Sequence, residues 1–250
     1  MINYATFSRN IDSHGIMYSV LELKNISFSP RDGSKRKILD QISLCINPGT
    51  LTVITGPNGS GKSTLAQIIM GLKAPTSGQI FLNNQNITRD DITTRAKKGI
   101  SFSFQQPVKF KGLTVYELLN IASGELTSQK SAGQYLRKVG LDPATYLPRE
   151  ISDKLSGGEL KRIEIVSVLA RKDSKLIIFD EPEAGIDLWS FTHLIKVSQK
   201  LKSDNRTLII ISHPEKILKI ADRIIVLENG KIKSAGSPTK ILPIITGGKP

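Results

Sequence analysis

Two segments near the start of the chain alternate hydrophobic and polar residues. Residues 20–28 and 38–46 each show this period of two, and a stretch containing glycine and lysines, residues 30–37, separates them. Alternation is typical of a strand with one buried face, and two such strands joined by a short turn form a hairpin. The pattern therefore predicts an antiparallel β unit at this end of the chain.

Shorter runs that are almost entirely apolar follow. Residues 51–55 form one that ends at a glycine, and apolar residues then recur at helical spacing at Leu65, Ile68, Ile69 and Leu72. A strand buried on both faces followed by a loop and a helix is expected here. Similar runs lie at residues 100–104, 176–180, 207–212 and 224–227.

Helical patterns between several of these runs predict an α/β fold, with a mixed central sheet flanked by helices beside the antiparallel β unit. From about residue 113 to 170 the pattern is mostly helical, with helices expected at 115–122, 132–139 and 158–169. We interpret this segment as an inserted helical subdomain. A length of 250 residues, 39% of them hydrophobic, fits a single globular domain over residues 18–250.

Residues 1–17 lack the apolar core of a secretory signal, and we expect them to form a disordered leader. No stretch approaches the roughly 18 apolar residues of a membrane-spanning helix. A single cysteine, Cys45, excludes an intrachain disulfide and fits a reducing compartment, so a cytoplasmic location is expected.

The formal net charge is +13, but the basic residues are scattered, with groups at 35–37, 95–98, 196–202 and 231–233. This distribution favours a solvated basic surface. The alternative is an anionic partner other than a nucleotide, such as nucleic acid, an acidic protein or a lipid surface.

A phosphate-binding motif lies between the first buried run and the helix that follows it. Its spacing is G-x-x-x-x-G-K-[ST], and its glycines let successive backbone amides point at phosphate oxygens. The lysine then contacts the β- and γ-phosphates, and the last hydroxyl is a ligand for Mg²⁺. The motif predicts binding of Mg-ATP by Gly56, Pro57, Asn58, Gly59, Ser60, Gly61, Lys62 and Ser63, with Thr64 following.

A second apolar run, residues 176–180, ends in two adjacent carboxylates, Asp180 and Glu181. Neighbouring side chains on a strand point in opposite directions, so the two acids suit different roles. Together with the phosphate-binding motif, the pair predicts that Asp180 holds Mg²⁺ and that Glu181 activates a water.

Residues 155–159, Leu-Ser-Gly-Gly-Glu, resemble the signature motif of ABC ATPases and lie between the two Walker motifs. The resemblance covers residues 20–236 and implies a P-loop NTPase fold of the ABC cassette type. It implies that Gln105 is the Q-loop glutamine, a ligand of Mg²⁺ and part of the catalytic machinery. It also implies that Asp187 belongs to the D-loop that contacts nucleotide, and that His213 is the switch histidine.

The same resemblance implies that two copies meet head to tail in the ATP-bound state. Each Walker A motif is then closed by Ser156, Gly157 and Gly158 of the other copy, with Glu181 as the base. Where many members have a tyrosine that stacks on adenine, this chain has Pro30, with Phe28 two residues earlier. The loss of that stack, worth about 1–3 kcal/mol, predicts modest affinity or loose base selectivity.

Residues 95–108 and 159–165 are similar to those of SufC, the ABC ATPase of iron-sulfur cluster assembly. That resemblance implies a soluble SufB/SufD-like scaffold as the partner, with residues 107–112 as the docking surface. The alternative is the ATP-binding subunit of a membrane transporter, with a permease subunit as the partner. A nucleic-acid partner is not favoured, because the chain has neither two cassettes nor a long coiled coil.

Overall fold

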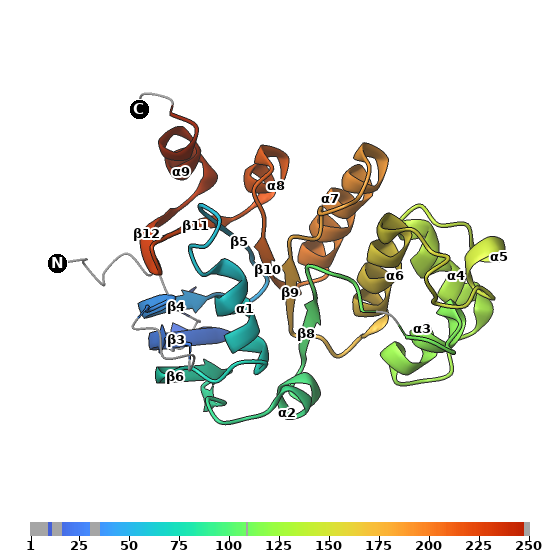
Figure 1. Cartoon of the computed structure of the whole chain (residues 1–250), viewed down its shortest axis with the longest axis horizontal. Coiled ribbons are helices and arrows are strands. Elements are labelled where there is room, and N and C mark those ends of the chain that lie inside the picture. Colours follow the sequence, from blue (N-terminus) through green and yellow to red (C-terminus); the bar gives the residue numbers. More distant parts are fainter. Residues whose placement is uncertain (1–9, 12–16, 31–35, 109, 248–250) are drawn as a thin grey trace.

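The computed structural model describes residues 10–11, 17–30, 36–108 and 110–247. A six-stranded sheet runs through the middle of the molecule in the order β12-β11-β5-β10-β9-β8 (Figure 1). All neighbours in it are parallel except β11 and β12, which form an antiparallel pair. Its strands are β5 Leu51–Thr55, β8 Ile100–Ser103, β9 Leu176–Asp180, β10 Thr207–Ile211, β11 Arg223–Glu228 and β12 Lys231–Gly236.

The predicted hairpin is confirmed, and it belongs to a second, four-stranded antiparallel sheet in the order β4-β3-β6-β7. Its strands are β3 Leu21–Phe28, β4 Leu39–Ile46, β6 Ser77–Leu82 and β7 Gln85–Asn86. The expected leader, residues 1–17, lies mostly outside the described residues. Within it, β1 Asn10–Ile11 pairs with β2 Met17–Tyr18.

Helices cover both faces of the central sheet. Alternate residues of each strand point to opposite sides, so Val53 and Ile210 enter one core and Ile54 and Ile211 the other. One core contains α1 and the antiparallel sheet, and the other contains α3, α4 and α6 to α9. The helices are α1 Lys62–Met70, α2 Ile92–Lys97, α3 Val115–Ser123, α4 Gln129–Lys138, α5 Pro143–Tyr146, α6 Gly157–Ala170, α7 Leu188–Ser203, α8 Glu215–Ile220 and α9 Pro238–Ile245.

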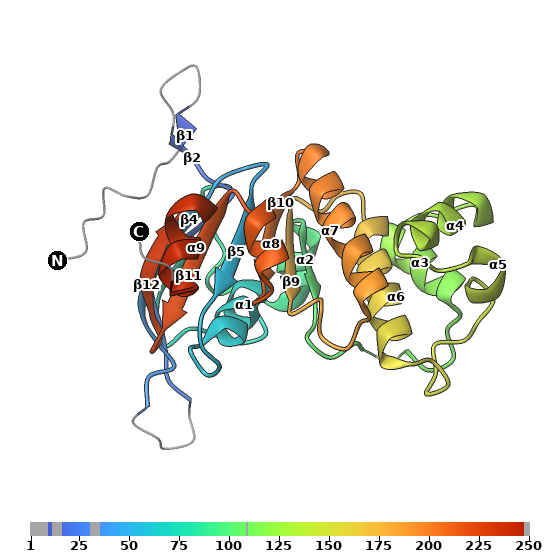
Figure 2. The ribbon, with the colours of Figure 1, turned by 90° about the horizontal axis from the view of Figure 1, so that it is seen from above.

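The segment expected to be a helical insertion contains α3, α4, α5 and α6, at the end of the molecule opposite the antiparallel sheet (Figures 1 and 2). One residue of the α1 prediction is wrong. Gly71 ends α1 in a left-handed conformation, so Leu72 lies beyond the helix and is 42% exposed. In the described ranges, no helix combines the length and apolar character that crossing a membrane requires.

Arg95 departs from the expected basic surface, because its side chain is buried. Its guanidinium donates to the backbone carbonyls of Ile68 and Ile69 at 2.6 and 2.8 Å, and to those of Asp90 and Thr88 at 3.0 and 3.1 Å. The first two carbonyls belong to the last turn of α1, where helical acceptors lack intrahelical partners. Arg95 therefore supports the carboxyl end of the helix that follows the phosphate-binding motif.

Replacing Arg95 with methionine should lower the free energy of unfolding by about 3 kcal/mol, because buried carbonyls lose their donors. For a chain of this size the melting temperature should fall by about 6–12 °C in calorimetry. Arg89→Met provides the matched control, since Arg89 is exposed in the same region. A melting temperature equal to that of the control would contradict this role.

Candidate nucleotide site

The phosphate-binding motif forms the turn between β5 and α1, as its position in the sequence predicts. Gly56 and Gly61 have φ angles of 139° and 100°, a region that favours glycine. A Cβ atom on Gly56 would lie 1.9 Å from the carbonyl oxygen of Leu227, so the backbones of the turn and β11 are in close contact. Pro57, Asn58, Gly59 and Ser60 complete the turn, and a cavity of about 630 Å³ borders residues 55–58 and His213.

Lys62 is the first residue of α1, and its side chain folds back over the turn. Its Nζ donates to the carbonyl oxygens of Gly56 and Pro57 at 2.8 and 3.0 Å. Burial lowers the pKa of Lys62, while the nearby carboxylates Glu181 and Asp180 act in the opposite direction. The phosphate-binding turn is therefore next to the Lys62 ammonium and the amino end of the nine-residue helix α1. Thr64 lies in the first turn of that helix. This arrangement suits an anionic phosphate.

Ser63 and Asp180 come together from α1 and β9. The Ser63 hydroxyl donates to Asp180 Oδ1 at 3.1 Å, and Asp180 is almost fully buried. Burial raises the pKa of Asp180 above its ordinary value. A hydroxyl and a carboxylate beside a phosphate-binding turn are the hard oxygen ligands that Mg²⁺ takes, so these residues fit the ion and would hold it.

Gln105, Glu181 and His213 form a cluster next to this pair. Gln105 Nε2 donates to Glu181 Oε2 at 2.7 Å, and His213 Nε2 lies 4.0 Å from Glu181 Oε1. Burial, followed by the charge of Lys62, lowers the pKa of His213, so the imidazole is neutral at pH 7. The three residues come from the ends of different strands, and the structure brings them together.

Glu183 is a residue of this site that the sequence interpretation missed. It accepts from the Ser212 hydroxyl at 2.7 Å and from the backbone amide of His213 at 3.4 Å. Burial raises the pKa of Glu183. Its carboxylate therefore fixes the backbone that carries His213. The signal was the third acid in Asp-Glu-Pro-Glu, residues 180–183.

The residues at the start of α6 lie away from the phosphate-binding turn of the same chain, because α6 and α1 are well separated in both views (Figures 1 and 2). Ser156 is the N-cap of α6, and its hydroxyl accepts from the backbone amide of Glu159 at 3.2 Å. Glu159 Oε2 accepts from the backbone amide of Ser156 at 2.6 Å, which completes a capping box. Gly157 and Gly158 follow in the first turn.

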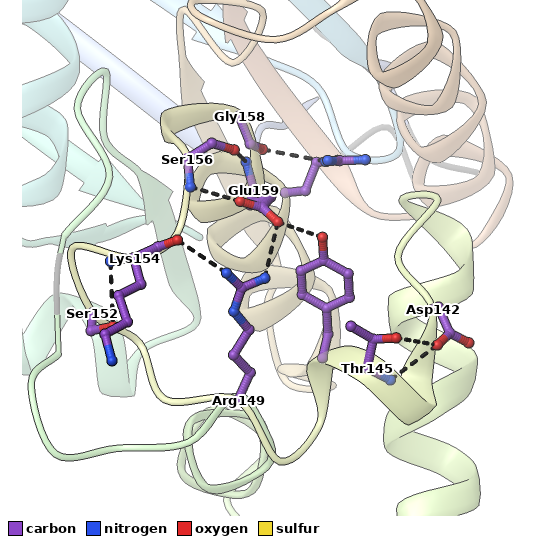
Figure 3. A network of polar contacts seen from close by, with 10 residues as sticks. Asp142, Thr145, Arg149, Ser152, Lys154, Ser156, Gly158 and Glu159 are labelled. Atoms are coloured by element: carbon purple, nitrogen blue, oxygen red, sulfur yellow. Dashed lines mark hydrogen bonds and ion pairs between the residues drawn. The ribbon is translucent and has the colours of Figure 1, made fainter.

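Glu159 also ties α6 to the segment around α5 (Figure 3). Its Oε1 accepts from the Tyr146 hydroxyl and from Arg149 Nη1, the latter at 3.2 Å. The Tyr146 hydroxyl is the main reason why the pKa of Glu159 falls to about 2, and the Ser156 backbone and Arg149 add to it. The helical segment therefore holds the amino end of α6 through one ionised carboxylate.

Tyr146→Phe should raise the pKa of Glu159 from about 2 toward its ordinary value of 4.5. A lowered folded-state pKa gives stability that is present above pH 4.5 and is lost as the pH falls toward 2. The variant should lose that contribution at higher pH than the parent chain does. Carbon NMR titration of the Glu159 carboxyl measures the shift. Tyr116→Phe is the control, because Tyr116 donates to the Thr127 carbonyl instead.

Asp187 caps α7, because its carboxylate accepts from the Ser190 amide at 2.8 Å. The loop before it touches α6: a Cβ atom on Gly158 would lie 3.2 Å from the carbonyl oxygen of Gly185. Within one chain, Asp187 and the start of α6 thus lie side by side, while the phosphate-binding turn belongs to another part of the molecule.

A family model described as ABC transporter matches residues 39–184, which include the phosphate-binding turn, the start of α6 and the Asp180–Glu181 pair. The chain belongs to the ABC transporter family. It is an ABC ATPase, which uses ATP together with Mg²⁺. The predicted cassette fold is thereby confirmed.

Three comparisons place this ABC ATPase among known proteins. It is 35% identical to an uncharacterised ABC transporter ATP-binding protein of Methanocaldococcus jannaschii, over 90% of this chain and 92% of that protein. It is 34% identical to the energy-coupling factor transporter ATP-binding protein EcfA2 of Spiroplasma kunkelii, over 87% and 75%. A dimeric ATP-binding cassette in a post-hydrolysis state, bound to ADP and Pi, matches with a TM-score of 0.78 and 26% identity, over 87% and 98%.

The signature helix α6 of this ABC ATPase also holds the backbone just before Gln105. Lys161 Nζ donates to the Phe104 carbonyl, and Glu164 Oε1 accepts from the Phe104 amide at 2.7 Å. Lys161 is fully buried and lies 3.4 Å from Glu164 Oε2. Burial lowers the pKa of Lys161 and raises that of Glu164, and each charge partly offsets the shift of the other. A buried ion pair thus connects α6 to the residue next to Gln105.

Lys161→Met should reduce kcat about tenfold, equivalent to about 1.4 kcal/mol, with little change in KM for ATP. The reason is that Gln105 loses its fixed position against Glu181, while the phosphate-binding turn is untouched. Steady-state ATPase kinetics separate the two constants. Lys172→Met is the control, since Lys172 forms an exposed pair with Glu125. Equal kcat in both variants would show that this backbone anchor has no part in turnover.

The position expected for adenine stacking carries no tyrosine in the structure. Phe28 ends β3 and packs partly against the core, and Lys73 Nζ lies 5.6 Å from the centre of its ring. Pro30 follows in the loop, and residues 31–35 lie outside the described residues. The ammonium of Lys73, which follows α1, therefore lies over the Phe28 ring.

Proposed function

We propose that this ABC ATPase is the ATP-hydrolysing subunit of a membrane transporter, of the kind represented by energy-coupling factor transporters. The observation that supports this most directly is its similarity to transporter ATP-binding proteins along most of their length. Lys62, Ser63 and Asp180 hold Mg-ATP in this proposal, with the backbone of residues 56–61 around the phosphates.

The cluster around Glu181 then performs hydrolysis. Glu181 accepts a proton from a water whose oxygen attacks the γ-phosphorus, and the bond between that phosphorus and the ADP oxygen breaks. Gln105 fixes the Glu181 carboxylate by the 2.7 Å hydrogen bond, and neutral His213 faces its other oxygen. The products are ADP and phosphate.

A second copy of the chain completes each site. Its Ser156, Gly157 and Gly158 present the amino end of α6 to the γ-phosphate, with Asp187 beside them. Two observations support this: the start of α6 lies apart from its own phosphate-binding turn, and Leu188, next to Asp187, is 72% exposed. The similar cassette bound to ADP and Pi is dimeric.

A mixing experiment tests the shared site. Lys62→Ala spoils the phosphate-binding turn and Ser156→Arg spoils the signature helix, so each variant alone should be inactive. A mixed dimer contains one intact site, made from the turn of one copy and the helix of the other. ATPase activity should therefore return on mixing, and its absence with both variants folded would count against the shared site.

The flank of Gln105 supplies the partner-docking surface in this proposal. Val108 and Phe110, which lie close together in the chain, are 42% and 41% exposed. Apolar side chains gathered on a surface mark interaction sites. A helix or loop of the membrane partner would cover them and would sense Gln105 directly.

Affinity purification from detergent-solubilised membranes tests both the partner and the surface. The parent chain should retain an integral membrane protein, and Val108→Asp with Phe110→Asp should lose it. Leu72→Asp is the matched control, because Leu72 is equally exposed but lies after α1. Capture of the same membrane protein by all three chains would place docking elsewhere.

The second candidate is a SufC-like role with a soluble SufB/SufD-like scaffold as the partner. Its basis is the similarity of residues 95–108 and 159–165 to SufC. In the structure these two segments are in contact, because Lys161 and Glu164 bind the backbone of Phe104. The same purification distinguishes the candidates. A soluble scaffold as the retained protein supports this role, and an integral membrane protein excludes it.

A further inference from the structure

A basic cavity of about 450 Å³ lies between α4 and α7, outside the nucleotide site. Leu169, near the carboxyl end of α6, also lines it, and α6 runs between α7 and the helices α3 and α4 (Figure 2). Its volume lies within the range of pockets that bind small molecules, about 300–1,000 Å³. The cations around it are Arg137, Lys138, Lys196, Lys200 and Arg206.

These positive charges are only partly compensated, by Asp204 in the lining and by Asp142 near Arg137. Asp204 is the carboxylate of the lining, and it pairs with Lys200 at 2.8 Å. Arg206 donates to the backbone carbonyl of Arg171 at 3.1 Å, which neutralises no charge. Within the part of the chain that the structure describes, Arg137 and Lys196 have no carboxylate at ion-pair distance. Their side chains are exposed at the rim, where they are available to an anion.

The floor of the cavity is apolar. Leu169, Val197 and Leu201 are buried there, and Tyr135 lines one side with its ring 4.8 Å from Lys138 Nζ. A hydrated inorganic ion would leave the partly exposed Tyr135 ring and the small exposed part of these apolar side chains in contact with water. An occupant with an anionic group and an apolar body satisfies both the rim and the floor.

ATP at the phosphate-binding turn cannot account for this cavity. Arg206 comes directly before β10 and His213 is the second residue after it, so the cavity and the nucleotide site lie at opposite ends of the parallel strands. The cations of the cavity therefore face an anion other than the bound nucleotide.

We propose that the cavity between α4 and α7 binds a small organic phosphate. Its phosphate lies between Arg137 and Lys196, and its apolar body covers Leu169 and Val197. A bound molecule connects α4, in the helical segment, to α7, which follows Asp187. A ligand in the cavity would thus link the helical segment, which contains α6, to the part of the domain that contains α7.

Calorimetric titration with 1-naphthyl phosphate tests the site on the full chain. Arg137→Gln combined with Lys196→Gln should weaken binding at least about tenfold, the factor that corresponds to about 1.4 kcal/mol. Lys97→Gln combined with Lys130→Gln removes the same charge from exposed positions away from the cavity and should leave affinity unchanged. Lys62→Ala should also bind normally. Inorganic phosphate and 1-naphthol should each bind more weakly, because each lacks half of the ligand.

Several outcomes would overturn the proposal. Equal affinity in both double variants would show that the cavity is not the site, and loss of binding in Lys62→Ala would assign it to the phosphate-binding turn. If inorganic phosphate binds as tightly as 1-naphthyl phosphate, the apolar floor of the cavity contributes nothing to affinity. Co-sedimentation with phosphatidylglycerol vesicles that depends on Arg137 and Lys196, without binding of 1-naphthyl phosphate, would make the ligand a lipid headgroup.

Discussion

Replacing Glu181 with glutamine should leave Mg-ATP binding intact and reduce turnover by about 10² to 10⁴, the contribution of a positioned general base. The amide has the size of the carboxylate and keeps a carbonyl oxygen that can accept the Gln105 hydrogen bond. It cannot accept a proton from water. The variant should therefore accumulate as an ATP-bound dimer, visible as an earlier peak in gel filtration with Mg-ATP.

Two comparisons make that result decisive. Glu125→Gln removes an exposed carboxylate that pairs with Lys172, and it should hydrolyse ATP normally without accumulating as a dimer. The parent chain with Mg-ADP should run as a monomer. Hydrolysis by Glu181→Gln at the parent rate would assign the base to another group, such as Glu183, which lies two residues further along the chain.

Lys62→Ala should weaken Mg-ATP binding by at least about 100-fold, or about 3 kcal/mol. Lys62 is only 4% exposed, so the attraction of its ammonium for phosphate is weakly screened by water. Its removal also leaves the Gly56 and Pro57 carbonyls without a donor, which weakens the turn itself. Calorimetric titration with Mg-ATP measures the loss.

Lys73→Ala is the matched control for Lys62→Ala. Lys73 follows the same helix, but its ammonium lies over the Phe28 ring. Its removal should change affinity much less, and any change would report on the Phe28 face. Equal affinity of the Lys62 variant and the parent chain would mean that the turn does not hold the triphosphate.

The sequence predicts best those elements whose signal is local. The run at β9 ends at Asp180 in the structure as predicted, because its apolar residues continue without interruption up to that carboxylate. Helix α7 has buried Leu194, Val197 and Leu201 at helical spacing and was overlooked. Three other elements have a weak local signal: α9 contains Pro243, α5 has only four residues, and β6 contains Gly78. These elements depend on tertiary contacts.

The candidate site likewise contains residues with a local sequence signal and residues without one. The phosphate-binding turn and the Asp180–Glu181 pair are contiguous motifs, so their residue types and spacing carry the prediction. The contact of Lys161 with Phe104 joins residues 57 positions apart, and that of Gln105 with Glu181 joins residues 76 apart. The resemblance to ABC ATPases supplied Gln105 and His213. Neither the motifs nor that resemblance indicated the hydrogen bonds of Glu183 or the anchoring of Phe104.

The close approach of Gly158 to the Gly185 carbonyl couples the ends of a dimer. In the proposed pair, Gly158 touches the triphosphate of one site, whereas Gly185 lies four residues after Glu181 of the other. Whatever displaces the first glycine must displace the second, since no side chain separates them. In that proposed pair the two catalytic centres would be coupled, and ATP turnover should rise with a Hill coefficient above one.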